Sequence, residues 1–430
     1  MVRPGGLFFS VDLMRSFFLL LSSPFFFLTG IQAAAPQSPF ISQLISSAEA
    51  KIKTAPDNPD AYSDLAFGFA RRARETEDPV YWSRAEQAIA KCLKLKPGYF
   101  EARKTRVLLR LQQGRFADAE EEGKALNKQT PDDNPLYGFL ADAALSQGKY
   151  PEAEALTQRM LDLRQVNGPG LERAARVRES IGFPDGAAEF WNSALRLASS
   201  SDTEERAYIL TELAGMSRRR ARFAEASRYA SDALALEPDY PAALIEQARI
   251  ALENKKPELA IAALTARLAQ GDSFVAQYWL SVALQAAGRA AEANAAGQKF
   301  LHTLAASQSY RSRNELLARY YTSHGEAAKA VDLLKADAAK GLDQQAADAY
   351  AMALLETGNA AQAEKEIARA LQPGVLNPSL FLDAAKIAKK NNDFAAARTY
   401  LKKCIETNAS SEYAEAALQE LQNTKDNASH

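Results

Sequence analysis

The residue types that most often carry catalysis or bind metals are few and widely spaced in this chain. It contains three histidines, His302, His324 and His430, and two cysteines, Cys92 and Cys404. None of these histidines is spaced from a cysteine or from another histidine as zinc ligands are. The sequence also lacks a glycine-rich phosphate loop, a nucleophile elbow and the kinase motifs. We therefore predict no metal, no cofactor and no enzymatic activity.

One cluster of cations could bind an anion. The segment SRRRAR (residues 217–222) contains Arg218, Arg219, Arg220 and Arg222. Either the cluster contacts an anion or an acidic peptide, or it places positive charge at the C-terminal end of a helix, where the helix dipole favours cations. We favour the second explanation.

The bulk composition is ordinary for a soluble protein. Of the 430 residues, 47% are apolar and 24% are charged, and the formal net charge is −1. So balanced a charge gives no reason to expect nucleic acid or an anionic membrane as a partner. Two cysteines in a chain of this length exclude a disulfide-rich scaffold.

The N-terminal segment differs from the rest of the chain. Residues 16–31 (SFFLLLSSPFFFLTGI) carry no charge, follow Arg15 and precede the small residues Ala33–Ala35. A basic start, a short apolar core and a small-residue exit are typical of a secretory signal peptide. We therefore predict that residues 1–35 are removed and that the protein is exported, to the periplasm or as a secreted protein. The alternative is an uncleaved signal anchor that tethers the protein to the membrane. The sequence leaves two starts of translation open, the first methionine and Met14.

A period of about 34 residues runs through the remaining chain. Gly114, Gly148 and Gly182 follow one another at intervals of 34 residues, inside similar phrases such as QGRFADAEE and QGKYPEAEA. In each phrase an alanine follows the turn residue by five positions. The series of turn residues continues with Lys255, Gly288, Gly325, Gly358 and Asn392. The alanines are Ala119, Ala153, Ala187, Ala226, Ala260, Ala293, Ala330, Ala363 and Ala397.

This period predicts pairs of short antiparallel helices. Glycine and asparagine readily adopt the left-handed conformation that ends a helix, and an alanine at the crossing lets two helices approach closely. Proline then separates one pair from the next, as in ALALEPDYPAAL (residues 233–244), where Pro238 follows one helix and Pro241 starts another. One pair cannot bury both of its faces, so neighbouring pairs must stack. Cys92 and Cys404 hold equivalent positions in the first and last pairs, so we expect two buried free thiols that lie far apart.

The pattern resembles the tetratricopeptide repeat. The best unit is residues 134–167, in which the residue types of the family signature are matched by Tyr137, Leu140, Ala141, Gly148, Tyr150 and Ala153. The resemblance covers most of residues 58–411 in about ten degenerate units. It implies an all-α fold, a right-handed superhelical solenoid of antiparallel helix pairs.

The resemblance also divides the chain. We predict a capping helix within residues 38–57, a repeat array over residues 58–409, a second capping helix over residues 410–423 and a disordered tail over residues 424–430. Two segments depart from the pattern. Residues 71–84 contain an insertion between the two helices of the first unit, and residues 198–206 form a longer link between two units.

In tetratricopeptide repeats the first helix of each unit lines a concave groove that binds extended peptides. Carried over by register, the resemblance implies an inner row of Asp142, Arg176, Gly215, Arg249, Val282, Arg319, Met352 and Lys386, with Tyr278 beside it. Four of these eight residues are basic, so we expect a protein or peptide partner that carries carboxylates. The asparagines and lysines that hold chaperone C-termini in one subfamily are absent, so we expect a different ligand.

These observations predict a non-catalytic scaffold that binds a partner peptide or helix in the groove, in cell-envelope or secretion-related assembly. One alternative is an accessory or regulatory subunit of an envelope enzyme or of a polysaccharide-export complex. A second is an enzyme, such as a glycosyltransferase or hydrolase, that bears repeats. That alternative needs a non-repeat segment of about a hundred residues or more, and the sequence shows none.

Overall fold

The fold consists of helix pairs that follow the predicted period. The computed structural model describes residues 38–76, 78–306, 313–372 and 374–426. The chain divides into two units, residues 1–34 and 35–430, and all described residues belong to the second unit. Within these residues every regular element is an α-helix and no strand occurs. The predicted signal peptide lies outside the described residues.

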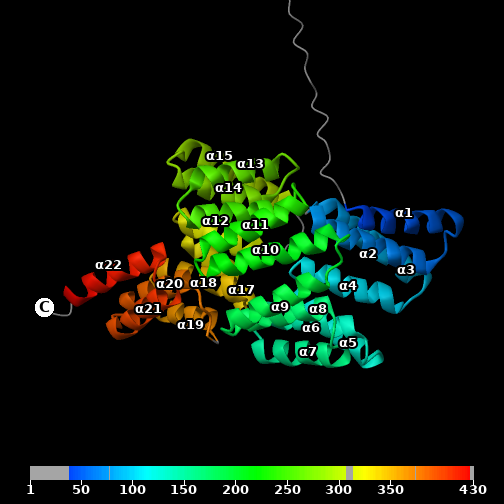
Figure 1. Cartoon of the computed structure of the whole chain (residues 1–430), viewed down its shortest axis with the longest axis horizontal. Helices are drawn as coiled ribbons and strands as arrows, with labels where there is room; N and C mark the ends of the chain where they lie inside the picture. Colours follow the sequence, from blue (N-terminus) through cyan, green and yellow to red (C-terminus); the bar gives the residue numbers. More distant parts are fainter. Residues whose placement is uncertain (1–37, 77, 307–312, 373, 427–430) are drawn as a thin grey trace, which may run out of the picture. The chain divides into compact units, whose positions relative to one another are not determined.

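Ten antiparallel pairs extend from α2 to α21, and each consists of a first helix that packs against the second helix following it (Figure 1). The first helices are α2 (Pro59–Thr76), α4 (Phe100–Gln112), α6 (Asn134–Ser146), α8 (Gly168–Ser180), α10 (Thr203–Arg219), α12 (Pro241–Glu253), α14 (Phe274–Ala286), α16 (Arg313–Ser323), α18 (Gln344–Glu356) and α20 (Pro378–Lys390). The second helices are α3 (Pro79–Leu95), α5 (Phe116–Gln129), α7 (Tyr150–Leu163), α9 (Pro184–Leu197), α11 (Phe223–Leu236), α13 (Pro257–Leu268), α15 (Ala290–Ala306), α17 (Ala327–Ala338), α19 (Ala360–Ala370) and α21 (Phe394–Thr407).

The turns inside the pairs have the predicted geometry. The backbone angle φ is positive at the six glycines of the series, and also at Lys255 (51°) and Asn392 (61°). In the α6–α7 turn, the amide of Lys149 donates a hydrogen bond to the carbonyl of Ala144 at 2.9 Å, which satisfies an otherwise unpaired end of the helix. The α10–α11 turn uses Ala221 (φ 56°), which the sequence pattern did not single out.

The alanines that follow the turns lie where the two helices of each pair cross. All nine have a relative exposure of 0% except Ala293, at 6%. Larger side chains fill the space around them, and Trp191 is the largest of those that are completely buried. The predicted packing of small residues at the crossings is therefore confirmed.

A helix flanks the array at each end. α1 (Pro39–Thr54) buries Ile41 and Ala48, and it packs against α2. α22 (Glu412–Asp426) packs against α20 and α21 and buries Ala414 and Ala417. It extends into the segment predicted as a disordered tail, of which residues 427–430 lie outside the described part. Among the described helices, none combines the length and the apolar character needed to cross a bilayer.

The extra residues of the first unit lengthen its helices. The predicted insertion between these helices is wrong, because α2 and α3 extend over 18 and 17 residues and only residues 77 and 78 separate them. The added turn of α2 is stable because it buries Ala73 and pairs Arg72 with Glu75 at 2.6 Å. The link at residues 198–206 behaves similarly, since α10 begins at Thr203 and has 17 residues.

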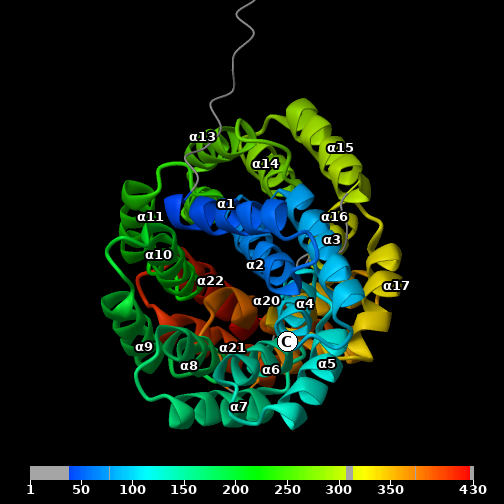
Figure 2. The same ribbon diagram turned by 90° about the vertical axis from the view of Figure 1, so that its right-hand side faces the viewer.

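The pairs wind so that second helices such as α5, α7, α9 and α11 lie outside, and first helices lie nearer the centre (Figure 2). Successive turns of the winding touch through backbone. A Cβ atom added to Gly182 would lie 2.1 Å from the carbonyl oxygen of Gly374, and one added to Gly341 would lie 2.3 Å from that of Gln147. Near the C-terminus, Asn408 donates a hydrogen bond to the carbonyl of Ala221 at 3.0 Å.

Candidate functional site

The predicted inner row lies on the first helices, and all four of its cations have partners in the chain. Asp142 on α6 accepts hydrogen bonds from Arg173 (2.7 Å) and Arg176 (2.8 Å) on α8. Both arginines are largely buried, with side-chain exposures of 13% and 20%. Although burial disfavours its charge, the carboxylate of Asp142 holds the pKa of Arg176 above its ordinary value.

Further along the row, Arg249 and Tyr278 belong to an aromatic contact. Arg249 lies 5.0 Å from the ring centroid of Trp279 and 3.4 Å from a carboxylate oxygen of Glu246. Burial and the neighbouring Arg218 lower the pKa of Arg249. Tyr278 is only 7% exposed, because its ring packs against those of Trp279 and another aromatic residue of α15. Tyr278 is thus packed inside the repeats and exposes little of its surface to a partner.

The last members of the row differ in exposure. Arg319 donates hydrogen bonds to Glu315 at 2.8 Å and to Asp348 at 3.0 Å. Met352 is half-buried against the core of the α18 region. Lys386 is exposed and pairs with Asp383 at 2.8 Å. The four cations that we expected to attract an acidic partner therefore each have a carboxylate of this chain within hydrogen-bonding or ion-pairing distance.

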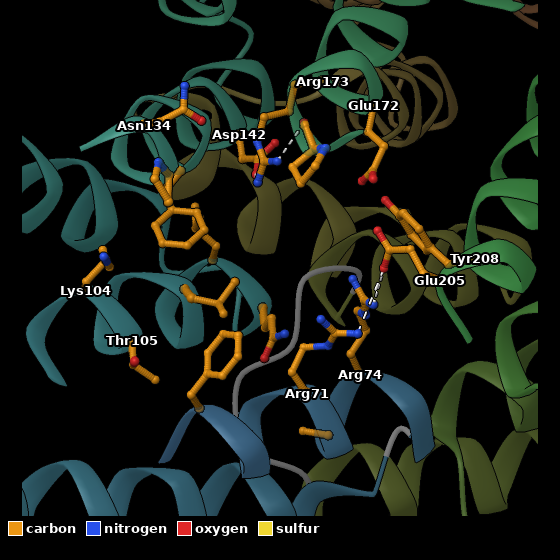
Figure 3. A pocket seen from close by; sticks show the side chains of 18 of the residues that line it. Arg71, Arg74, Lys104, Thr105, Asn134, Asp142, Glu172, Arg173, Glu205 and Tyr208 are labelled. Atoms are coloured by element: carbon orange, nitrogen blue, oxygen red, sulfur yellow. Dashed lines mark hydrogen bonds and ion pairs between the residues drawn. The ribbon is translucent and has the colours of Figure 1, made fainter. Parts of the chain in front are cut away.

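A cavity of about 860 Å³ lies on the concave side of the first five repeats (Figure 3). Its walls come mainly from α2, α4, α6, α8 and α10. Asp142 and Arg176 line it, whereas the other predicted site residues belong to later repeats and lie outside it. The structure thus brings two of the predicted residues together in one cavity and leaves the rest apart.

One part of the cavity wall is apolar. Phe67 on α2 is 39% exposed, and Leu108 on α4 and Phe139 on α6 are half-buried. Phe67 belongs to a small group of large apolar side chains with exposed surface in the described residues. An apolar surface held inside a concave site is typical of a binding pocket.

The opposite part of the wall is a polar junction between α2 and α10. Arg74 donates hydrogen bonds to Glu204 (2.6 Å) and Glu205 (2.9 Å), and Arg71 donates one to Glu204 (3.2 Å). Glu204 is only 1% exposed and accepts a further hydrogen bond, at 3.1 Å, from the hydroxyl of Tyr240. Burial opposes the charge of Arg74, yet the two glutamates hold its pKa well above the ordinary value.

The junction joins the two irregular segments of the sequence. Arg74 lies in the added turn of α2 and Arg71 directly before it, and Glu204 and Glu205 lie in the first turn of the lengthened α10. The sequence showed both departures from the period, but it gave no sign that residues 133 positions apart would meet. We term this group (Arg71, Arg74, Glu204, Glu205 and Tyr240) the α2–α10 junction.

Residues 110–169 match the family model described as tetratricopeptide repeat. They contain part of α4, the complete α5, α6 and α7 and the start of α8, and thus the middle of the cavity wall. The chain is a tetratricopeptide-repeat protein. Proteins with this fold generally act as non-catalytic scaffolds for protein interactions. No curated protein sequence matches the chain significantly.

Several solved structures are similar to the tetratricopeptide array at low sequence identity. A human IFIT1 dimer with PPP-AAAA is 13% identical, with 87% of this chain and 96% of that chain covered and a TM-score of 0.48. The APC/C hetero-tetramer Cut9–Hcn1 is 12% identical, with 89% and 93% covered and a TM-score of 0.38. The P58(IPK) TPR domain is 15% identical, with 76% and 99% covered and a TM-score of 0.23.

The arginine cluster of the sequence lies at the end of a tetratricopeptide helix, α10, and is paired within the chain. Arg218 donates to Glu246 and Glu253, which belong to α12. Two further arginines of the cluster contact carboxylates of the preceding pair, since Arg219 donates to Glu179 at 2.6 and 2.9 Å and Arg220 donates to Asp185 at 2.9 Å. These three guanidinium groups hold neighbouring repeats together.

The cysteines and one of the histidines, which could have had catalytic or metal-binding roles, pack against other residues of the tetratricopeptide array. Cys92 and Cys404 are buried free thiols whose sulfur atoms lie near the carbonyl oxygens of Pro59 (3.2 Å) and Tyr413 (3.4 Å). The ring of His324 stacks on a tyrosine of its own helix at 3.9 Å between centroids. Within the described residues, no group of three or more histidine, cysteine or acidic side chains is arranged to hold a metal.

Proposed function

We propose that this protein is a non-catalytic scaffold whose cavity holds a segment of a partner protein. The observation that carries the proposal is the cavity of about 860 Å³, walled by the first helices of five successive repeats and containing the exposed ring of Phe67. A cavity of this size accepts a few side chains of a peptide or helix. Its walls stand on packed helices, so little order has to be gained when the partner binds.

The chemistry of the cavity indicates the kind of segment that it would hold. An apolar side chain would cover Phe67, Leu108 and Phe139, which form the apolar wall. The lining contains the same number of basic and acidic side chains, but the carboxyl of Glu172 keeps its proton at neutral pH, because burial and the neighbouring Glu205 raise its pKa to about 8. Basic side chains such as Lys104 and Arg164 belong to this lining, which supports a partner segment with a carboxylate beside an apolar residue.

We place this scaffold outside the cytoplasm, in the assembly of a cell-envelope or secretion complex. The support is the apolar leader of residues 16–31 and the small residues Ala33–Ala35 after it. The mass of the protein recovered from its source tests this placement. A mature chain that begins near Ala35 supports export, whereas a chain that retains residues 16–31 supports the anchored alternative, or a cytoplasmic protein if it remains in the soluble fraction.

Binding in the cavity is tested with a peptide selected from a random display library on the mature chain. The Phe67→Ala variant is expected to weaken binding of the selected peptide about tenfold, equivalent to about 1.4 kcal/mol, because one wall of the pocket is lost. Leu259→Ala is the control, since Leu259 is 61% exposed on α13, away from the cavity. Fluorescence anisotropy measures both affinities. Equal affinity of the wild-type chain and the Phe67→Ala variant for every selected peptide would overturn the proposal.

A charge variant tests the acidic preference separately. Lys104 lines the cavity from α4 and has a side-chain exposure of 17%. Lys104→Glu should weaken binding of the selected peptides and remove acidic residues from the sequences that a second selection returns. If the second selection returns the same acidic sequences, Lys104 does not determine the acidic preference.

A further inference from the structure

Two acidic side chains of the cavity wall have no cationic partner in the described part of the chain. Glu172 on α8 is 6% exposed and Glu212 on α10 is half-buried, and both line the cavity. Among the described residues, no cationic nitrogen lies within ion-pairing distance of either carboxyl, and no N–H or hydroxyl group donates to it. The other acidic residues of the lining each have a lysine or arginine within that distance, and these are Asp64, Glu101, Asp142 and Glu205.

The absence of a partner matters most for Glu172, which is more than nine-tenths buried. Burying a carboxylate is costly unless a cation or hydrogen-bond donors compensate for the lost water. The arginines next to Glu172 do not supply this compensation, because Arg173 and Arg176 direct their guanidinium groups to Asp142, at 2.7 and 2.8 Å. The arginines of the α2–α10 junction donate to the glutamates of that junction. A buried polar group without a partner at the surface of a cavity points to a ligand that supplies one.

The unpartnered carboxyls belong to one wall of the cavity. Glu205, Tyr208 and Glu212 follow one another at intervals of three and four residues, so they share a face of α10, and all three line the cavity. Figure 3 shows the side chain of Glu172 pointing from α8 toward Glu205 and Tyr208. Burial raises the pKa of Tyr208, and the nearby Glu212 and Glu172 raise it further. This wall therefore gathers several oxygen atoms that can accept hydrogen bonds.

We propose that Glu172 and Glu212 form a cation subsite, which takes a lysine or arginine side chain of the bound segment. The inference deepens the proposed function and rests on it. Ammonium and guanidinium groups carry only hydrogen-bond donors, which match a wall of oxygen acceptors. A metal ion fits less well, because within the described residues no group of three histidine, cysteine or acidic side chains is arranged to hold one.

The subsite gives the bound segment a direction. Figure 3 shows Lys104 on the opposite side of the cavity from Glu172 and Tyr208. Arg164, directly after α7, also lines the cavity and has no acidic partner among the described residues. A segment with its carboxylate toward Lys104 and its cation toward Glu172 meets opposite charges at both ends. The reversed segment meets like charges at both ends, so one orientation is favoured.

The protonation of Glu172 makes the binding of a cation depend on pH. Burial, and after it the neighbouring Glu205, raise the pKa of Glu172 to about 8. A bound cation favours the ionised carboxylate, so the affinity should rise as the pH increases through about 8. A lysine ammonium keeps its charge over this range, because its ordinary pKa is about 10.4. The charged or titratable groups that face Glu172 are Arg71 and Arg74 from α2, Asp142 from α6, Arg173 and Arg176 from α8, Asp202 before α10, Glu204, Glu205, Tyr208 and Glu212 from α10, and Tyr240 before α12.

A neutral replacement in the peptide tests the subsite on the unmodified chain. Peptides are selected on the mature chain from the random display library, and each lysine or arginine is then replaced in turn by norleucine, which keeps an apolar stem without the charge. We expect one position at which the replacement weakens binding at least tenfold at about pH 9, measured by fluorescence anisotropy. The unmodified peptide should bind up to about thirtyfold more tightly at about pH 9 than at about pH 6.5. Full affinity after every replacement would overturn the proposal.

Isosteric variants of the chain identify the residues responsible. The double variant Glu172→Gln/Glu212→Gln should bind the unmodified and the norleucine peptide with similar affinity, because neither glutamine attracts a cation. Glu172→Gln alone should remove the dependence on pH. Glu189→Gln, at an exposed position of α9 outside the cavity, is the control and should keep both wild-type responses. A tenfold preference for the charged peptide that survives in the double variant would overturn the assignment to these residues.

The Phe67→Ala variant separates this inference from the proposed function. Peptides that lose affinity in Phe67→Ala and keep it in the double variant Glu172→Gln/Glu212→Gln occupy the cavity without using the subsite, which would contradict the cation subsite alone. Peptides whose affinity falls in both variants would support both. Peptides that bind both variants as tightly as the wild-type chain would contradict the proposed function and the subsite together.

Discussion

Replacing Gly182 with alanine is expected to separate two turns of the superhelix. Gly182 has φ of +85°, and an added Cβ would lie 2.1 Å from the carbonyl oxygen and 2.6 Å from the carbonyl carbon of Gly374. The left-handed conformation alone costs alanine about 1–2 kcal/mol. The overlap involves backbone on both sides, so no side-chain rotation relieves it, and overpacking of this kind costs about 1–3 kcal/mol more.

A matched control isolates the second contribution. Gly288 occupies the same place in its repeat, with φ of +76°, and an added Cβ would have no atom within 4 Å. Gly288→Ala therefore carries the conformational cost without the overlap. Urea denaturation followed by circular dichroism gives the free energy of unfolding, and small-angle scattering gives the radius of gyration. We expect Gly182→Ala to lose about 1–3 kcal/mol more than Gly288→Ala and to expand. Equal losses together with identical scattering profiles would refute the contact between turns.

Three further changes have expected outcomes. Asp142→Ala leaves two largely buried arginines without their shared carboxylate and should cost about 1–3 kcal/mol in urea denaturation, whereas Asp132→Ala, at an exposed position, should cost nothing measurable. Trp191→Ala empties a completely buried site and should cost about 3–5 kcal/mol by the same measurement; a smaller loss would mean that the repeat collapses into the space. Burial raises the pKa of Cys404 to about 12, so at about pH 8 a disulfide reagent should leave the native thiols intact and react with both after denaturation.

The helices and their pairing were predictable because they depend on residues that are close together in the sequence. The spacing of the turn residues determines where one helix ends, and the alanine five positions later determines where its partner crosses. Lys255 and Asn392 were identified by position although neither is glycine, and both adopt positive φ. Ala221 was not predicted as a turn residue, because alanine is rarely found in that conformation and only its place in the period indicated a turn.

The contacts between distant repeats were not predictable in the same way. Each repeat adds a small rotation to the last, and the position of the fifth or ninth repeat depends on the accumulated sum of these rotations. Thus Gly182 was recognised as a turn residue, but its contact with Gly374 was not. Arg176 was correctly placed on a first helix by register, yet its pairing with Asp142 depends on side-chain directions that a single sequence does not fix.

Along the chain a regular repeat packs against its neighbours, and the contact between the first and fifth repeats uses residues that the regular repeat does not supply. Here α2 supplies an added turn that carries Arg74 and directly follows Arg71, and α10 supplies a lengthened start that carries Glu204 and Glu205. Both departures from the period are therefore explained by one contact. The regular positions build the walls of the cavity, and the irregular ones join its first helix, α2, to its last, α10.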